Sequence, residues 1–259
     1  MAAAGVAQSD PVLLRLRPPP AGQAQHLQTV VEVWLTAAPA DSTPPILRLT
    51  QFSARSGTRD DSGLVFTDVI DSSRIETPSS AGGQVPPPRD MLRSLRTVTR
   101  LDDRGRSVAA RIQYAPQPAP EDQFMLRALQ PLAVAGTRLA IIGLPEQPVR
   151  PGDSWTDSLR FDLSTDQATS GALVTVGGTG NGRYRLERVE TRGTSRVAIL
   201  TAVGEVRAAG STEPIAATAR MELDVDTGLL LRSDAELSGL MTTRMGSTPA
   251  RVRLSQRAW

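Results

Sequence analysis

Two Asp-Ser/Thr-Gly triplets are the residues of this sequence whose types and spacing could do chemistry. They are Asp61-Ser62-Gly63 and Asp226-Thr227-Gly228, and paired carboxylates that share one proton are the machinery of aspartic proteases. The second triplet follows a strand pattern, whereas the first follows the polar pair Arg59-Asp60. Asp and Gly also dominate hairpin turns. We therefore interpret both triplets as turns and keep an aspartic protease as a remote alternative.

Most other catalytic chemistry lacks its residues in this chain. The sequence has no cysteine and one histidine, His26, so thiol chemistry, multi-histidine metal sites and most catalytic triads are excluded. The glycine-rich run Gly177–Gly182 is followed by a strand pattern and not by a helix. That order favours a β connection over a phosphate-binding loop. We predict that the protein is not an enzyme and uses no cofactor or metal.

The basic residues are all arginine, and acidic residues nearly balance them. Lys and Arg number 29 against 27 Asp and Glu, so the charge does not predict a nucleic-acid partner. Arginine suits bidentate contacts with carboxylates and anionic headgroups. Four residues near the end of the sequence share one strand phase: Arg251, Arg253, Arg257 and Trp259. This edge could bind an acidic protein surface or lipid headgroups, although a solvated strand face is commoner.

Aromatic residues are scarce and are the remaining candidates for contact with a partner. They make up 3% of the chain, and large aromatic side chains carry much of the energy of cores and interfaces alike. Filling a core is their commoner role. The candidate contact residues are Trp34, Phe124, Met125, Trp155, Arg251, Arg253 and Trp259.

Alternation with period two dominates the chain and predicts the elements that would position these side chains. Arg220–Asp226 alternates apolar and charged residues, and the pattern resumes after Thr227-Gly228 as far as Leu237, which predicts an antiparallel hairpin. Two similar hairpins are predicted over Leu92–Tyr114 and Tyr184–Val206. Further strands are expected at Leu13–Arg17, Leu27–Thr36, Ile46–Phe52, Leu64–Ile70, Ser154–Leu163, Ala172–Val176 and Arg251–Leu254.

The predicted fold is mainly β: a curved antiparallel sheet or half barrel built from hairpins, with one short helix and Pro-rich loops. The helix should follow Pro120, where acidic residues suit a first turn and an apolar stripe follows at Phe124, Met125, Ala128, Leu129 and Leu132. Pro-rich segments at 18–20, 77–89 and 115–120 should be surface loops or arms.

The domain organisation is expected to be simple. Residues 1–10 should be a flexible or signal-derived N-terminus, and residues 11–259 a single β-rich domain. The alternative is two halves, 11–118 and 146–259, joined by a helical segment over 119–145. No stretch approaches the about 18 apolar residues of a membrane-spanning helix, so we predict no transmembrane helix.

One phrase resembles a known family. Leu144-Pro145, followed by Pro148-Val149-Arg150-Pro151-Gly152-Asp153-Ser154-Trp155, is similar to the LP…PV-x-x-GDSW segment of exported β-rich proteins of unknown function related to LolA-like lipoproteins. The order of the later strands agrees, mainly over the C-terminal half. The resemblance implies a curved sheet or half barrel whose concave face is covered by helices and can hold an acyl chain.

Three functions remain open at this point. The leading hypothesis is a non-catalytic, periplasmic or otherwise extracytoplasmic scaffold, peripheral to a membrane. It would dock onto a membrane-associated protein complex through its loops and Arg-rich surface. The alternative is a carrier that shelters a lipid or other apolar ligand beside Phe124, Met125 and Leu129. The protease is the third.

Overall fold

The computed structural model describes residues 10–35, 43–77, 92–93, 95–102, 104–114, 143–162, 177–208, 213–243 and 246–259. These residues form one antiparallel sheet of eleven strands in the order β5-β4-β3-β2-β1-β11-β10-β9-β8-β7-β6. The strands are β1 (Gln25–Trp34), β2 (Leu47–Asp60), β3 (Gly63–Glu76), β4 (Leu95–Leu101), β5 (Ser107–Tyr114), β6 (Ser154–Asp162), β7 (Gly177–Arg192), β8 (Ser195–Ala208), β9 (Pro214–Asp224), β10 (Leu230–Thr243) and β11 (Gly246–Ala258).

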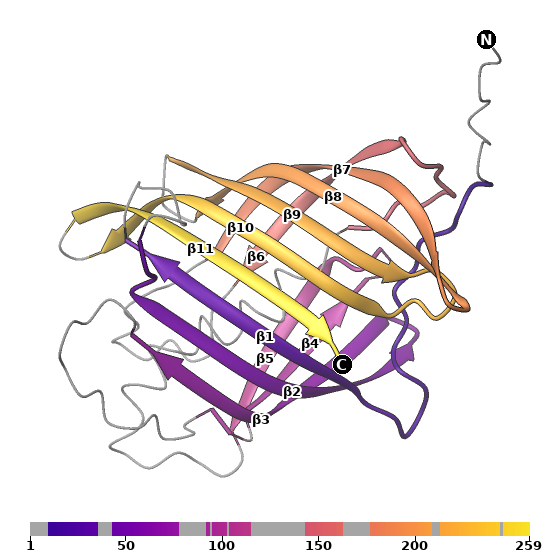
Figure 1. The fold of residues 1–259 in the computed structure, drawn as a ribbon, viewed down its shortest axis with the longest axis horizontal. Coiled ribbons are helices and arrows are strands. Elements are labelled where there is room, and N and C mark those ends of the chain that lie inside the picture. The colour runs from indigo at the N-terminus through magenta and orange to yellow at the C-terminus, as the bar shows by residue number, and fades with distance from the viewer. Residues whose placement is uncertain are drawn as a thin grey trace.

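The sheet curls but does not close. The first and last strands, β1 and β11, pair in its middle, and within the described part of the chain β5 and β6 are its two unjoined ends. Figure 1 shows β4, β5 and β6 lying behind the front layer formed by β1 and β9 to β11. The predicted mainly β, curved antiparallel sheet is therefore confirmed.

The expected short helix is not found. The described ranges contain strands, turns and bends but no helix, and most of the strands carry the period-two alternation that buries one face. The residues on which the expectation rested, Phe124, Met125 and their neighbours up to Leu132, lie outside those ranges. No helix that is long and apolar enough to cross a membrane occurs in the described residues.

Short turns join the strands at one end of the sheet, at residues 61–62, 102–106, 193–194 and 225–229. The Asp-Ser/Thr-Gly triplets form two of these turns, as their composition predicts. Gly63 and Gly228 both have positive φ, at 125° and 72°, a conformation in which glycine avoids the strain of a side chain. Most of the longer connections leave the strands at the opposite end, so the two ends differ in construction.

The N-terminal segment packs across the end that carries the short turns. Val12 pairs with Val149 through backbone hydrogen bonds of 2.8 and 2.9 Å, and the Arg17 amide donates to the Gly228 carbonyl at 3.0 Å. The Arg15 guanidinium donates to the carbonyls of Pro145 and Glu146, both at 2.7 Å. These contacts hold residues 12–17 in place without a strand, so the strand predicted at Leu13–Arg17 is wrong; the isolated bridge at Val12 lies just before it.

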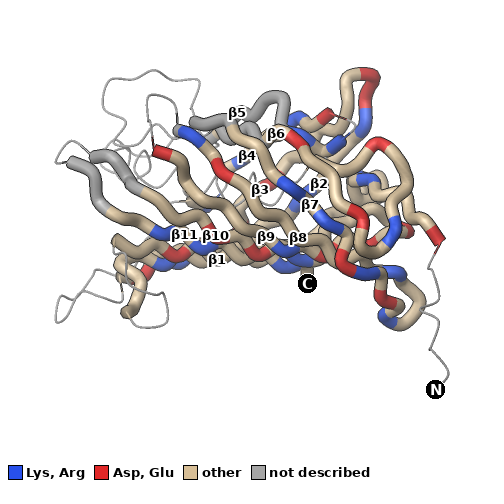
Figure 2. The backbone as a smooth tube through the Cα atoms, turned by 90° about the horizontal axis from the view of Figure 1, so that it is seen from above, with Lys and Arg blue, Asp and Glu red and all other residues tan. Residues whose placement is uncertain are grey.

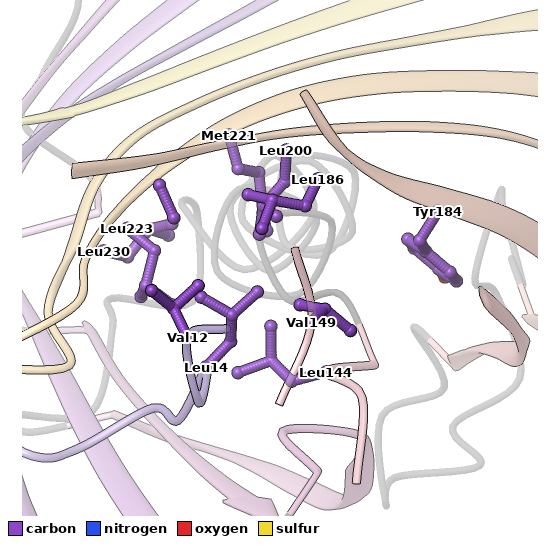
Figure 3. Close-up of a cluster of buried hydrophobic side chains, with 11 residues drawn as sticks. Val12, Leu14, Leu144, Val149, Tyr184, Leu186, Leu200, Met221, Leu223 and Leu230 are labelled. Atoms are coloured by element: carbon purple, nitrogen blue, oxygen red, sulfur yellow. The ribbon is translucent and has the colours of Figure 1, made fainter. Parts of the chain in front are cut away.

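A filled apolar cluster lies beneath this segment. Figure 3 shows the side chains of the segment meeting those of the sheet, so this end of the curled sheet is a packed core. The cluster comprises Val12, Leu14, Leu144, Val149, Tyr184, Leu186, Ala198, Leu200, Met221, Leu223 and Leu230. A second cluster, farther along the concave face, comprises Val31, Leu49, Ile70, Leu92, Leu95 and Leu254.

Gly177–Gly182 belongs to β7 and pairs with both β6 and β8, so its interpretation as a connection is wrong. A Cβ atom at Gly180 would overlap the backbone carbonyl of Glu205. Glycine therefore lets neighbouring strands approach closely at this position.

Candidate functional site

The outer face of the sheet carries a row of alternating charges across β2, β1, β11 and β10. The Glu32 carboxylate accepts from the Arg48 guanidinium at 2.6 Å. Arg253, opposite Glu32 and Glu236 in the strand register, lies 3.5 Å from a Glu236 oxygen. Arg251 reaches the other oxygen of Glu236 at 3.2 Å. Two of the predicted contact arginines thus share one carboxylate in a row where charges largely cancel, as the interspersed colours of Figure 2 illustrate.

Trp34 lies on the same outer face but is covered. Its side chain is buried, its indole nitrogen donates to the Thr43 carbonyl at 3.0 Å, and the Arg253 guanidinium stacks 5.7 Å from its ring centroid. A tryptophan held in this way stabilises the row of charges by a cation–π contact. It does not present a free surface.

Trp155 lies on β6, near the unjoined edge of the sheet. Its indole nitrogen donates to the Gly143 carbonyl at 3.0 Å, and its ring stacks on Tyr184 with centroids 5.9 Å apart. The Tyr184 hydroxyl is buried and has no hydrogen-bond partner among the described residues. Burial, and then the charge of Asp157, raises the pKa of Tyr184, so this hydroxyl stays protonated and cannot serve as a base near neutral pH.

The same region links the two ends of the open sheet. The buried Asp157 carboxylate on β6 lies 3.1 Å from Arg104 and 3.6 Å from Arg106, both next to the β4–β5 turn. The Leu144 amide also donates to the Arg104 carbonyl at 2.7 Å. Side chains and one connecting segment therefore hold β6 against the β4–β5 turn where no strand ladder does.

Trp259 is the most exposed of the large apolar side chains described, with 74% of its surface accessible. Its backbone amide donates to the His26 carbonyl at 3.1 Å, so the chain at this point continues the pairing of β1 with β11. The His26 ring lies 5.4 Å from the indole, and the Phe52 ring meets it edge-on at 6.5 Å. An exposed tryptophan is thus held on a fixed backbone and braced by two rings.

Arg257 lies beside this aromatic group and differs from the other outward arginines of β11. Its partners in the register are Gln28 on β1 and Arg232 on β10. Arg232 donates to Asp234 at 2.6 Å, whereas Arg257 is exposed and has no carboxylate partner among the described residues. We call Phe52, His26, Trp259, Arg257 and Arg232 the aromatic–arginine patch.

The sequence predicted this patch only in part. The shared phase of Arg251, Arg253, Arg257 and Trp259 is confirmed, since all four alternate with the buried Leu254 and Gln256. Phe52, His26 and Arg232 come from three other strands, and their place beside Trp259 depends on register that local periodicity does not give. Phe124 and Met125 lie outside the described residues.

The paired triplets acquire no catalytic geometry of their own. Arg196 donates to the Asp226 carboxylate at 2.6 Å, and this hydrogen bond holds the pKa of Asp226 below its usual range. A proton-sharing dyad needs its two carboxyl groups to face each other, whereas the Asp226 carboxylate is engaged by an arginine. Asp61 is exposed in the β2–β3 turn. In the described ranges no three His, Asp or Glu side chains are grouped so as to hold a metal ion.

A small pocket lies between the N-terminal segment and the concave face. Its volume is about 10 Å³, which is about the room that one water molecule needs. Its lining includes Leu16, Arg17, Phe66 and the buried Arg55. This pocket is too small for an acyl chain.

Comparison with known proteins found no matching family model, curated protein or solved structure. The resemblance to LolA-like proteins therefore stays a prediction.

Proposed function

We propose that the protein is a non-catalytic, extracytoplasmic scaffold that docks onto a membrane-associated protein complex through its outer sheet face and the connections beside it. The observation that carries the proposal is the exposed Trp259, fixed by the β1–β11 ladder and flanked by Arg257. Tryptophan and arginine are the residues most enriched at the energetic centres of protein interfaces. Because the backbone is already ordered, binding would cost little conformational entropy.

The pairing of the acidic side chains supports binding over catalysis. Asp157, Asp226 and Glu236 are each held by arginine. A carboxylate that is already engaged by arginine contributes to a fixed pattern of directional contacts. The described part of the sheet therefore offers a rigid surface with directional contacts, which suits a scaffold.

A second candidate function, the carrier of an apolar or amphipathic ligand, is favoured by one feature of the concave face. Polar side chains form a buried belt there, between the two apolar clusters. Three of them, Gln51, Thr99 and Ser233, have a polar atom that finds no hydrogen-bond partner in the part of the chain that the structure describes. Such atoms cost about 1–3 kcal/mol each when nothing satisfies them, so a bound polar group at the belt would be stabilising.

A mild-detergent pull-down from native membranes, with proteins and lipids in the eluate identified by mass spectrometry, separates the two functions. The scaffold predicts a stoichiometric membrane-protein partner that Trp259→Ala releases. Val203→Ala is the matched control, because Val203 is also exposed, at 58%, but lies on β8 away from the patch. Stoichiometric lipid without a protein partner would favour the carrier. An eluate that contains neither a stoichiometric protein partner nor stoichiometric lipid would contradict both functions.

A further inference from the structure

We infer that the aromatic–arginine patch is the docking surface and that it recognises a short acidic segment of a protein partner. This inference rests on the proposed function and adds the location and the chemistry of the contact. Like the patch itself, it depends on residues from β1, β2, β10 and β11 that meet at the end of the sheet carrying the short turns.

The first argument is the charge at Arg257. On β11, Arg251 and Arg253 each lie within ion-pair distance of Glu236. Arg257 instead lies opposite Arg232 in the register, and like charges directly opposite each other across strands destabilise a sheet. A glutamate at this position would add a second carboxylate beside Arg232, which Asp234 already contacts, and extend the row of alternating charges. An arginine there is unfavourable for the isolated protein and favourable for an anionic partner.

The second argument is the arrangement of the rings. Trp259 is exposed although its backbone is hydrogen-bonded, and the Phe52 and His26 rings both lie close to its ring. With 74% of its surface accessible, the indole is an ordered apolar surface next to a cation. Apolar side chains flanking a carboxylate fit that combination, because the carboxylate can pair with arginine while its neighbours pack on the ring.

The third argument selects a protein segment over a membrane. Asp234, Glu236 and Glu32 lie on the same outer face as the patch, within a few residues of it along their strands. A planar anionic membrane laid on this face would cover carboxylates and arginines that already pair with one another, so its attraction would come chiefly from Arg257. A short peptide segment can contact Arg257, Arg232 and Trp259 without covering those carboxylates.

The test uses a pair of substitutions that change the net charge equally. The full chain carries Arg257→Glu or, as control, Arg253→Glu. Binding is measured by fluorescence anisotropy of a short labelled peptide in which Asp and Glu alternate with Leu. Its Asn and Gln counterpart, and vesicles of phosphatidylglycerol, are the comparison probes. Thermal unfolding of each variant is followed by circular dichroism.

We expect the wild-type protein to bind the acidic peptide, in a salt-sensitive way, and to bind neither comparison probe. Arg257→Glu should weaken peptide binding at least about tenfold and yet raise the unfolding midpoint by about 1–3 °C, because an unlike pair replaces a like pair. Arg253→Glu should lower the midpoint, since it places glutamate opposite Glu32 and Glu236, and should retain peptide binding.

Three results would overturn the inference: no peptide binding by the wild-type chain, equal binding by Arg257→Glu, or preferential binding to the vesicles. The pull-down keeps the two proposals distinguishable. If a stoichiometric partner is captured equally by the wild type and by Arg257→Glu, the scaffold function stands and this surface is wrong. If the peptide result holds but no partner is captured, the surface stands and the scaffold function is wrong.

Discussion

The ion pair between Arg55 on β2 and Asp68 on β3 allows a quantitative test of the concave face. The two residues are directly opposite in the register, their side chains are 5% and 2% exposed, and the shortest of their contacts is 2.7 Å. Phe66 covers the guanidinium at 5.4 Å. Because the pair is buried and the adjacent pocket has room for only about one water molecule, solvation can replace little of a lost partner, and Asp68→Asn should lower the free energy of unfolding by about 3–5 kcal/mol. Domains are stable by about 5–15 kcal/mol in total, so the effect is large.

The double variant Arg55→Met/Asp68→Leu removes both charges and should recover most of that loss, because an apolar pair has no desolvated charge to compensate. Urea denaturation followed by circular dichroism, with both single variants, completes the double-mutant cycle. The reasoning fails if Asp68→Asn costs less than about 1 kcal/mol, or if the double variant is less stable than the sum of the singles predicts.

Three further perturbations test other parts of the structure. Asp157→Asn should cost about 1–3 kcal/mol by removing the charge that two arginines share at the open edge, and unchanged urea denaturation would contradict this role. Gly228→Ala should cost more than Gly22→Ala, because both have positive φ but only at Gly228 would the added Cβ meet backbone, 2.7 Å from a carbonyl oxygen; equal losses in thermal unfolding would show that the contact is unimportant. Burial raises the pKa of Asp224, but hydrogen bonds from the following turn outweigh it and hold this pKa below its usual value. The resulting stability is present above the unfolded pKa of about 3.9 and is lost as pH falls through the lower folded value. Calorimetry below pH of about 4 should therefore show that the unfolding temperature of Asp224→Asn declines less steeply with falling pH than that of the wild type.

The hairpins could be predicted because their signals are local. The turn at 193–194 lies within the predicted hairpin Tyr184–Val206, the β4–β5 turn lies within the predicted hairpin Leu92–Tyr114, and the β9–β10 turn contains the predicted Thr227-Gly228. In each case period-two alternation and a positive-φ residue lie within a few positions of each other. The prediction failed at Gly177–Gly182, because a glycine-rich run carries no alternation of apolar and polar residues even when it forms a strand between two neighbouring strands.

The candidate site was harder to predict, since it is assembled across strands. The phase of β11 correctly placed Arg251, Arg253 and Trp259 on one face. It could not indicate that both arginines lie within ion-pair distance of Glu236 or that Trp34 is covered. Those facts depend on which residues of β1 and β10 lie opposite, and β1 is more than 200 positions away from β11 in the sequence.

The register that creates the patch is set by the interior and not by the outer charges. On the concave face of β11, Leu254 is buried opposite Val31 and Ala235, and the Gln256 amide donates to the buried Thr29 hydroxyl at 3.1 Å. A register shift of one residue would turn these side chains outward, and a register shift of two residues would break the buried pairing. Nothing in the interior constrains the side chain at 257, which points outward from the same backbone. Arg257→Glu can therefore change the charge of the patch while the interior holds the register, which is why opposite changes in binding and stability would identify recognition as the reason for an arginine there.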